Sequence, residues 1–354
     1  MSTETGSRKQ TWFRRPIIKI LLAVVICAGV LLSLTDIRKI LSVAQMVEPL
    51  FLALAFLATI LSYTFIGLAL RRILNLLGRH LSFREMFAIS WVSTALNYLV
   101  STGGVGGLAM RVFLLRKKNI SFSETFLVSF VHTLLINGVL IGFVVFGFGY
   151  LLTKRGLHLY QYMIAGGVLA IALLLSFLAA GSVINQPFRE RFIDFFYRLI
   201  NSISRRLRGK SVFKRDSLDE FKEEFNEGIS LMLVQKGRIV VPLFHVFLEW
   251  LFTLLTLYFS FITIGYRISP GVLIVGFAIG IFVSFISLIP GSIGIMEGSM
   301  AGIFYSLGIP LEVGIMAVLL YRLVYYIFPF VTSTVLYYPL FKEARAARVS
   351  ETLL

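Results

Sequence analysis

Long runs of apolar residues alternate with short polar and basic segments along this chain of 354 residues. A run of about 20 apolar residues is long enough to cross the hydrocarbon core of a bilayer, which is about 30 Å thick. Runs of this kind predict six full transmembrane helices: Ile17–Leu34, Pro49–Leu70, Thr125–Leu152, Tyr160–Ile184, Ile239–Ile264 and Leu311–Leu340. The pattern therefore predicts an all-α polytopic membrane protein.

Two further apolar regions, at residues 82–118 and 271–308, are interrupted by glycine-rich turns. In the first region, the stretch from Met86 to Val100 provides about 15 residues, or about 22 Å of helix, before the turn "STGGVGG". This is short of a full span. Basic residues lie on both sides of the region: Arg71, Arg72, Arg79, Arg84, Arg116, Lys117 and Lys118. Since Lys and Arg collect in cytoplasmic loops, we expect a re-entrant hairpin that enters and leaves on the cytoplasmic side.

The second interrupted region is predicted to be a hairpin that enters from the opposite side. It lies between two full crossings, after the charged segment 186–238 and before a basic C-terminal tail. Both of these flanking segments are expected in the cytoplasm, so the region must begin and end outside, with its turn at Pro290–Gly291. The alternative for either region is two short tilted crossings joined by a glycine bend. Hydropathy counts about eight spans in both cases, because it does not detect a turn within the membrane.

The predicted organisation is a basic cytoplasmic N-terminus at residues 1–16, an integral membrane domain at 17–340 and a cytoplasmic tail at 341–354. The first apolar run is long and lacks a small-residue cleavage site, so we expect a retained helix and not a signal peptide. The motifs "SFREMF" at Ser82 and "SFSETF" at Ser121 are near copies, and each has the Ser-x-x-Glu pattern of a capping box. Weak internal similarity of this kind is typical of inverted-repeat transporters.

Composition agrees with membrane insertion and excludes several functional classes. Apolar residues make up 57% of the chain and charged residues 15%, whereas soluble domains have about 25% charged residues. The net charge of +16 is explained by basic cytoplasmic loops, and without a recognisable motif we expect no nucleic-acid partner. The single cysteine, Cys27, and four scattered histidines show no metal-ligand spacing. We therefore predict no metal and no cofactor.

The charged segment 186–238 contains a predicted amphipathic helix. In "FRERFIDFFYRLINSISRRLRGK" apolar residues recur at helical spacing and basic residues surround them. The basic residues that we expect at the membrane surface are Arg198, Arg205, Arg206 and Arg208. The pattern is typical of a helix in the interface of an anionic leaflet. A linker helix whose charges only set the topology is an alternative of equal weight.

The tip of the first hairpin is a candidate anion site. A half-helix that begins at a buried turn presents free N–H groups and the positive end of its dipole, and glycines let a ligand approach that backbone. Arg111, about two turns further on, is placed to contact a phosphate with two N–H groups. The candidate residues are Asn97, Ser101, Thr102, Gly103, Gly104, Gly106, Gly107 and Arg111. The alternative is that the glycines only let helices pack closely.

The second tip carries Glu297, an acidic residue deep in an apolar region. Charges within a membrane are costly, and the first hypothesis for them is functional, with a partner nearby. The expected partner is Arg322 of the last crossing. Candidate substrate-binding residues here are Pro290, Gly291, Gly294, Glu297 and Arg322. His245 and Glu249, together with Glu297, are candidates for gating or proton coupling, and buried structural ion pairs are the alternative.

The stretches "TGGVGGLAMRVFLLRKKNISFSETF" and "SLIPGSIGIMEGSMAGIFYSLGIPLEVGIMAVLLYRL" resemble the flippase-like family defined by the transmembrane region of lysylphosphatidylglycerol synthases, the multiple-peptide-resistance factor type. Family members show a glycine-containing tip followed by an arginine, here Arg111, and a Pro-Gly-x-x-Gly-x-x-Glu tip, here ending at Glu297. The resemblance covers nearly all of Ile17–Leu340. It implies that the chain moves lipids between leaflets.

In the full synthases a soluble domain transfers an aminoacyl group from tRNA to the lipid. This chain stops at Leu354, so we expect no lysyltransferase activity and no catalytic residues.

The expected function is translocation of a phospholipid or other lipid phosphate through a cavity between two opposed hairpins. We expect an inner-membrane protein with both termini in the cytoplasm. One alternative is a membrane lipid transferase, which would need an acidic pair or a His-Asp set near a leaflet surface. Another is a scaffold that binds a separate lipid-modifying enzyme through Arg198–Arg215. A homo-oligomer is compatible with each of these.

Overall fold

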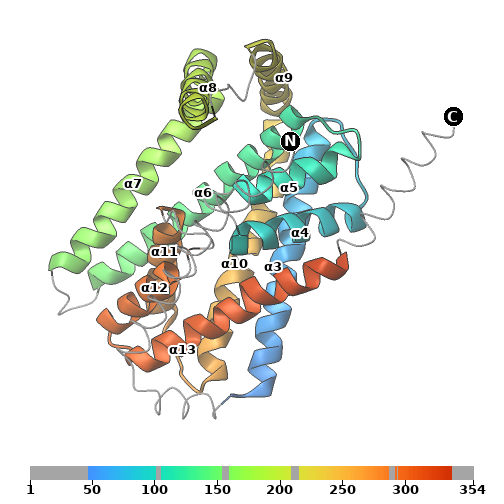
Figure 1. Ribbon diagram of the computed structural model, residues 1–354. Coiled ribbons are helices and arrows are strands. Elements are labelled where there is room, and N and C mark those ends of the chain that lie inside the picture. Colours follow the sequence, from blue (N-terminus) through green and yellow to red (C-terminus); the bar gives the residue numbers. More distant parts are fainter. Residues whose placement is uncertain are drawn as a thin grey trace, which may run out of the picture.

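The protein is helical, with short connections, in the residues that the computed structural model describes, 47–100, 105–153, 159–208, 215–286, 292 and 294–336 (Figure 1). These residues form eleven α-helices: α3 (Pro49–Leu76), α4 (Phe83–Val100), α5 (Val105–Arg116), α6 (Phe122–Thr153), α7 (Leu159–Ile184), α8 (Gln186–Arg208), α9 (Arg215–Val234), α10 (Val240–Thr263), α11 (Pro270–Ile286), α12 (Ile295–Ser306) and α13 (Leu311–Arg322). A 3₁₀ turn, η1 (Lys236–Ile239), precedes α10, and a π-helical turn, η3 (Leu323–Ile327), follows α13. The all-α prediction is confirmed for this part of the chain.

Four helices of the described chain are long and apolar enough to cross a membrane: Pro49–Leu76, Phe122–Thr153, Lys236–Thr263 and Leu311–Leu336. They coincide with four of the six predicted crossings. A fifth candidate is a bent pair, Leu169–Ile184 with Gln186–Ser202, whose axes meet at 113°. Its first helix belongs to α7, which covers the predicted crossing Tyr160–Ile184. Predicted segments that lie outside the described residues are 1–16, Ile17–Leu34 and 341–354.

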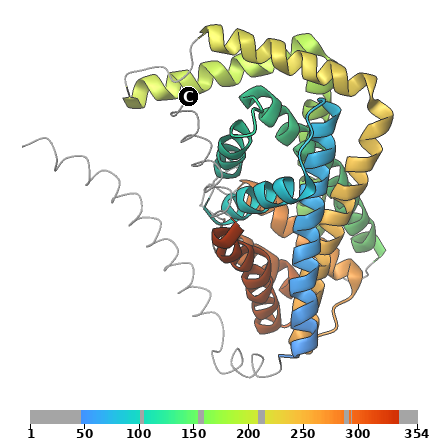
Figure 2. The ribbon, with the colours of Figure 1, turned by 90° about the vertical axis from the view of Figure 1, so that its right-hand side faces the viewer.

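The antiparallel helices α3 and α10 lie side by side along the bundle (Figure 2). Hydroxyl groups join them: Thr59 Oγ1 is 3.2 Å from Thr256 Oγ1, and Ser62 Oγ is 2.9 Å from Thr253 Oγ1. All four side chains are buried. Hydrogen bonds between small polar residues hold membrane helices together where lipid supplies no hydrophobic driving force.

Helices α4 and α5 form an antiparallel hairpin in the first interrupted region. A Cβ added to Gly107 would come within 2.8 Å of the carbonyl oxygen of Ser93, so only glycine fits there. One turn further along α5, Arg111 Nε lies 3.4 Å from Ser93 Oγ. At the open end, Lys118 Nζ contacts Glu85 Oε1 at 2.6 Å. These contacts set the register of the hairpin.

Helices α11 and α12 form a second antiparallel hairpin in the other interrupted region. A Cβ added to Gly276 would overlap the ring of Phe304, and a Cβ added to Gly280 would overlap the side chain of Met300. Phe304 and Met300 are fully buried. Small residues on α11 therefore let the two helices approach closely, as is common between membrane helices.

The two hairpins open at opposite ends of α6. Near the C-terminal end of α6, Tyr150 Oη is 3.2 Å from Oγ of Ser269, which directly precedes α11. Near its N-terminal end, Glu124 Oε1 contacts Nε of Arg79, shortly before α4, at 2.7 Å. The helices of the two hairpins therefore extend into the bundle from opposite ends.

Both predicted capping boxes are formed. The Ser82 N–H donates to Glu85 Oε2 at 3.0 Å, and the Glu85 N–H donates to Ser82 Oγ at 3.3 Å. The equivalent bonds between Ser121 and Glu124 measure 2.7 and 3.1 Å. These bonds satisfy N–H groups that have no partner within the first helical turn. They explain why α4 and α6 begin where the sequence predicts.

We expect Gly280→Ala to destabilise the protein by about 1–3 kcal/mol, the usual cost of overpacking a core, because the new methyl group overlaps buried Met300. Gly302→Ala in the same hairpin is the matched control. Nothing lies within 4 Å of a Cβ added there, so the better helix propensity of alanine should stabilise by up to about 1 kcal/mol. Thermal unfolding midpoints of the two variants in detergent test this, and equal midpoints would contradict the close packing of α11 on α12.

A second prediction concerns Glu85 at the open end of the first hairpin. Hydrogen bonds from the Lys118 ammonium and from Ser82 hold the pKa of Glu85 at about 2, below its usual 4.5. Because the pKa is lowered in the folded state, the stabilisation is present above about pH 4.5 and is lost as the pH falls toward 2. The Glu85 side chain is 32% exposed, so solvent screening reduces its contribution to about 1 kcal/mol.

We therefore expect Glu85→Gln to lower the unfolding midpoint at pH 7. The difference from the wild type should shrink below pH 4.5 and disappear near pH 2. Glu220→Gln, at an exposed position on α9, is the control. A difference for Glu85→Gln that persists at pH 2 would show that the carboxylate charge does not stabilise the hairpin.

Candidate functional site

Besides Arg189 of α8, five buried side chains bring charge or a histidine into the described bundle: Arg111, His132, Glu249, Glu297 and Arg322. Each is at most 8% exposed. A charge in an apolar interior is costly unless it is paired or hydrogen-bonded. The partners of these five side chains therefore indicate what each one can do.

Helix α5 places Arg111 between α4 and α6. Arg111 Nε lies 3.4 Å from Ser93 Oγ, and Nη1 lies 3.0 Å from Ser129 Oγ. Among the described residues these hydroxyls are its hydrogen-bond partners, and no carboxylate pairs with it. A guanidinium has five N–H donors, so several of them are not used by this part of the chain.

Asn97 caps α5, because its Oδ1 accepts a hydrogen bond from the N–H of Gly107 at 3.3 Å. This N–H was predicted to bind an anion, and it is instead used within the protein. Gly107 also lies too close to Asn97 and Ser93 for any side chain to fit. At these positions the structure favours the packing alternative. Gly106 is half-buried in the first turn of α5, and Ser101, Thr102, Gly103 and Gly104 lie outside the described residues.

Glu249 pairs with His132 of α6, at 3.0 Å between Oε2 and Nε2. His245, one turn earlier on α10, stacks against Phe65 with 6.1 Å between ring centroids. Helical spacing placed His245 and Glu249 on one face, but it did not identify His132, which is 117 residues away from Glu249. His132 is one turn from Ser129 on α6. This helix therefore carries a hydrogen-bond partner of Arg111 and, one turn away, the partner of Glu249.

The predicted ion pair between Glu297 and Arg322 is present, with Arg322 Nη1 bonded to Glu297 Oε1. The other oxygen, Oε2, accepts a hydrogen bond from the N–H of Gly294 at 2.8 Å. Gly294 has φ +82°, a conformation that glycine adopts without strain. Both carboxylate oxygens are thus used within the protein, which favours a structural lock. Pro290 and Gly291 lie outside the described residues.

Both hairpins contact the π-helical turn η3. From α4, the ring of Tyr98 lies 5.7 and 5.1 Å from the rings of Tyr325 and Tyr326. From α12, Met296 Sδ accepts a hydrogen bond from Tyr326 Oη at 3.1 Å. Arg322 directly precedes this turn, and π-helical turns within α-helices are frequent at functional sites. The sequence "YRLVYY" contained these tyrosines, but no local pattern linked them to Tyr98.

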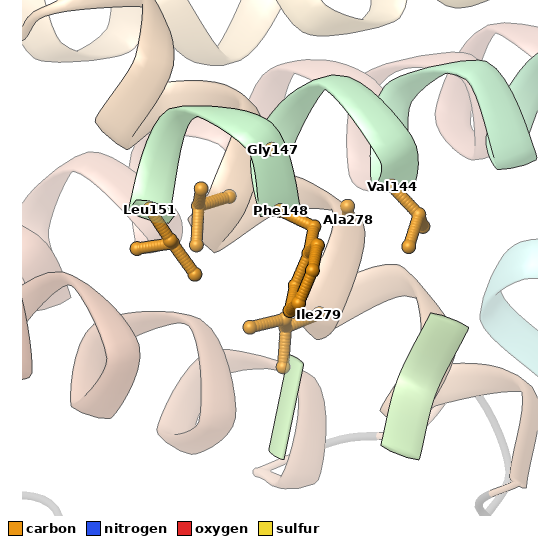
Figure 3. A pocket seen from close by; sticks show the side chains of 7 residues that line it. Val144, Gly147, Phe148, Leu151, Ala278 and Ile279 are labelled. Carbon is orange, nitrogen blue, oxygen red and sulfur yellow. The ribbon is translucent and has the colours of Figure 1, made fainter. Parts of the chain in front are cut away.

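An apolar pocket lies between α6 and α11 (Figure 3). Its lining residues are Val144, Gly147, Phe148, Leu151, Val275, Ala278 and Ile279. None of these side chains has a polar group with which to bind a charged headgroup. In the described part of the chain, no group of three or more His, Cys, Asp or Glu side chains is arranged to hold a metal ion.

Residues 17–333 match the family described as the lysylphosphatidylglycerol synthase TM region. The chain belongs to this family. The match extends over most of its length, which confirms the resemblance seen in the sequence. Together with the four candidate crossings, it identifies an integral membrane protein.

Three relatives are UPF0104 membrane proteins. A UPF0104 membrane protein of Methanothermobacter thermautotrophicus is 23% identical over 319 residues, which cover 89% of this chain and 91% of the relative. UPF0104 membrane proteins of Pyrococcus horikoshii and Methanocaldococcus jannaschii are 26% and 24% identical. These matches cover 71% and 82% of this chain, and 75% and 85% of the two relatives. The family and its relatives thus agree on a membrane protein over nearly the same length of chain.

We expect Glu297→Gln and Arg322→Gln each to destabilise the protein by about 3–5 kcal/mol, because each leaves one charge buried without its partner. The loss of stability in the double variant should be smaller than the sum of the losses in the two single variants, by at least about 1 kcal/mol. Unfolding midpoints in detergent provide the measurement. A cycle of Glu297→Gln with Arg116→Gln, an exposed arginine, is the control and should be additive. Additive losses for Glu297 and Arg322 would contradict a lock between them.

Proposed function

We propose that the protein translocates a phospholipid or another lipid phosphate between the leaflets of the membrane. The observation that carries the proposal is the buried guanidinium of Arg111. Its hydrogen-bond partners among the described residues are all hydroxyl groups. A phosphodiester carries a negative charge and presents two oxygens to the guanidinium fork. A lipid headgroup of this kind supplies the anion that these residues do not place beside Arg111.

Family membership supports a lipid as the source of the phosphate. The synthases that name the family make a phospholipid, lysylphosphatidylglycerol. The proposal assigns binding and movement of a lipid to this chain and assigns it no catalytic residue.

In this proposal both hairpins are re-entrant. None of α4, α5, α11 and α12 is among the described helices that are long and apolar enough to cross a membrane. The hairpins open at opposite ends of α6, so each enters from its own leaflet and ends beside η3. Interrupted helices are tolerated at this depth where protein or water satisfies their backbone. Six crossings, the first at Ile17–Leu34, complete the proposed topology.

The proposed orientation places the open end of the first hairpin in the cytoplasm. Basic residues cluster there: Arg71, Arg72, Arg79, Arg116 and Lys118. Basic residues near the ends of crossings favour the cytoplasmic side. The same rule favours a cytoplasmic position for both termini, and we propose the inner membrane as the location of the chain.

In the proposed mechanism the two hairpins have different roles. Arg111 receives the phosphate beside the first hairpin. The Glu297–Arg322 pair holds the second hairpin against the last crossing, and its separation opens the path toward the other leaflet. Such alternation requires two states that differ in their contacts with the lipid.

The test is translocation of labelled lipids in proteoliposomes that contain the purified protein. The panel includes anionic, zwitterionic and aminoacylated phospholipids and a neutral diacylglycerol. We expect the wild type to move lipids that carry a phosphate and Arg111→Ala to do so about 10- to 100-fold more slowly, as expected for the loss of a charge-assisted hydrogen bond. Arg116→Ala, on the exposed side of the same helix, is the matched control and should retain the wild-type rate.

Equal rates for Arg111→Ala and Arg116→Ala would show that Arg111 does not bind the lipid phosphate. Absence of translocation for every lipid, with correctly inserted wild-type protein and an imposed proton gradient, would overturn the proposal. It would then favour a scaffold for a separate lipid-modifying enzyme.

A further inference from the structure

Helix α8 exposes apolar side chains and buries polar ones. Its exposed apolar residues are Phe192, Phe195, Phe196, Leu199 and Ile200, each at least 41% exposed. Their spacing of three and four residues puts them on one face. Asn201 and Ser204 of the same helix are only 2% and 8% exposed. In contact with water this distribution would be unfavourable, so the apolar face indicates contact with a partner or with lipid.

Helix α9 lies against α8 on the side away from this apolar face. Lys222 Nζ of α9 contacts Asp194 Oδ1 of α8 at 2.8 Å, and Asp194 falls opposite the phenylalanines in the helical repeat. The apolar side of α9 is itself used, because Phe225 packs against Phe126 and Phe130 of α6. Figure 2 shows α8 and α9 lying across one end of the bundle. Helix α9 therefore leaves this apolar face, which we call the phenylalanine face of α8, uncovered.

The sharp bend between α7 and α8 is held by Arg189. Its Nη1 donates to the carbonyl oxygens of Ser182 and Val183 at 3.1 and 2.9 Å, near the C-terminal end of α7. Its Nε donates to Asn226 Oδ1 of α9 at 2.6 Å. Arg189 thus joins α8 to the end of α7 across the bend of 113°, and it also joins α8 to α9. It keeps the phenylalanine face in a defined orientation relative to α7.

The exposed apolar surface continues around this corner. Phe177 and Ile184 of α7 are 76% and 80% exposed, and α7 belongs to the fifth candidate crossing. The lipid that covers α7 is therefore adjacent to the apolar face of α8. A membrane accounts for both exposed surfaces without a separate protein partner.

A row of exposed arginines runs along one flank of the apolar face. Arg191, Arg198 and Arg205 are exposed and repeat every seven residues. Long basic side chains beside an apolar face place their charge at the level of the lipid phosphates. Arg206 and Arg208 belong to the same helix, but their side chains lie outside the described part. The charge on this flank is complementary to an anionic leaflet.

We propose that α8 lies in the interface of an anionic leaflet, with its phenylalanine face among the acyl chains and Arg191, Arg198 and Arg205 at the lipid phosphates. The inference is independent of lipid translocation, since it rests on the exposed surface of α8 and not on Arg111.

The test is the accessibility of a nitroxide attached to the full-length protein in vesicles. Phe195→Cys and, as the matched control, Asp219→Cys on α9 are each made in a Cys27→Ser background, so that one thiol is labelled. Asp219 has a side chain that is 59% exposed, and Phe195 is 56% exposed, so neither substitution disturbs the core. In vesicles with anionic lipid, the ratio of oxygen to nickel-chelate collision rates should be several-fold higher at 195 than at 219.

The contribution of charge is measured in the same way. Moving the protein from vesicles with phosphatidylglycerol to vesicles of phosphatidylcholine alone should shift the label at 195 toward water. Replacing Arg191, Arg198 and Arg205 by Gln should abolish the difference between the two lipids. A label at 195 that is as accessible to nickel as the label at 219 would overturn the proposal. So would a strong dipolar coupling between labels, which would show that a second copy of the chain covers this face, or equal depths in both lipids.

Discussion

A charge within a membrane protein needs a partner, because no bulk water is present to solvate it. The ion pair between Glu297 and Arg322 meets this requirement at the point where the second hairpin approaches the last crossing. Glu297 also accepts the N–H of Gly294, so the same carboxylate orders the start of α12. The hairpin, the last crossing and the π-helical turn that follows Arg322 therefore depend on one polar contact.

The first hairpin satisfies its buried charge in another way. Arg111 meets the hydroxyls of Ser93 and Ser129, and the nearest turn of α6 carries His132, which pairs with Glu249. Hydroxyls lower the cost of burying a guanidinium without neutralising it. One hairpin thus has its charge paired within the protein, whereas Arg111 of the other has hydroxyl groups as its hydrogen-bond partners among the described residues.

Close packing supports both arrangements. Gly107, Gly276 and Gly280 leave room for the side chains of Asn97, Phe304 and Met300 on the facing helix, and hydroxyl pairs join α3 to α10. Lipid tails are as apolar as leucine, so membrane helices associate through packing and hydrogen bonds and not through burial of apolar surface. Large apolar side chains can therefore remain exposed on α7 and α8, because their burial does not drive the association of helices in a membrane.

The sequence by itself determined the features that depend on local pattern. Apolar length predicted four crossings that the structure describes, the Ser-x-x-Glu motifs located the starts of α4 and α6, and the cost of a buried charge predicted the pair of Glu297 with Arg322. Tertiary structure alone decided which distant groups meet: Asn97 with the N–H of Gly107, and His132 with Glu249. Periodicity describes one helix at a time, whereas these contacts depend on how separate helices pack against each other.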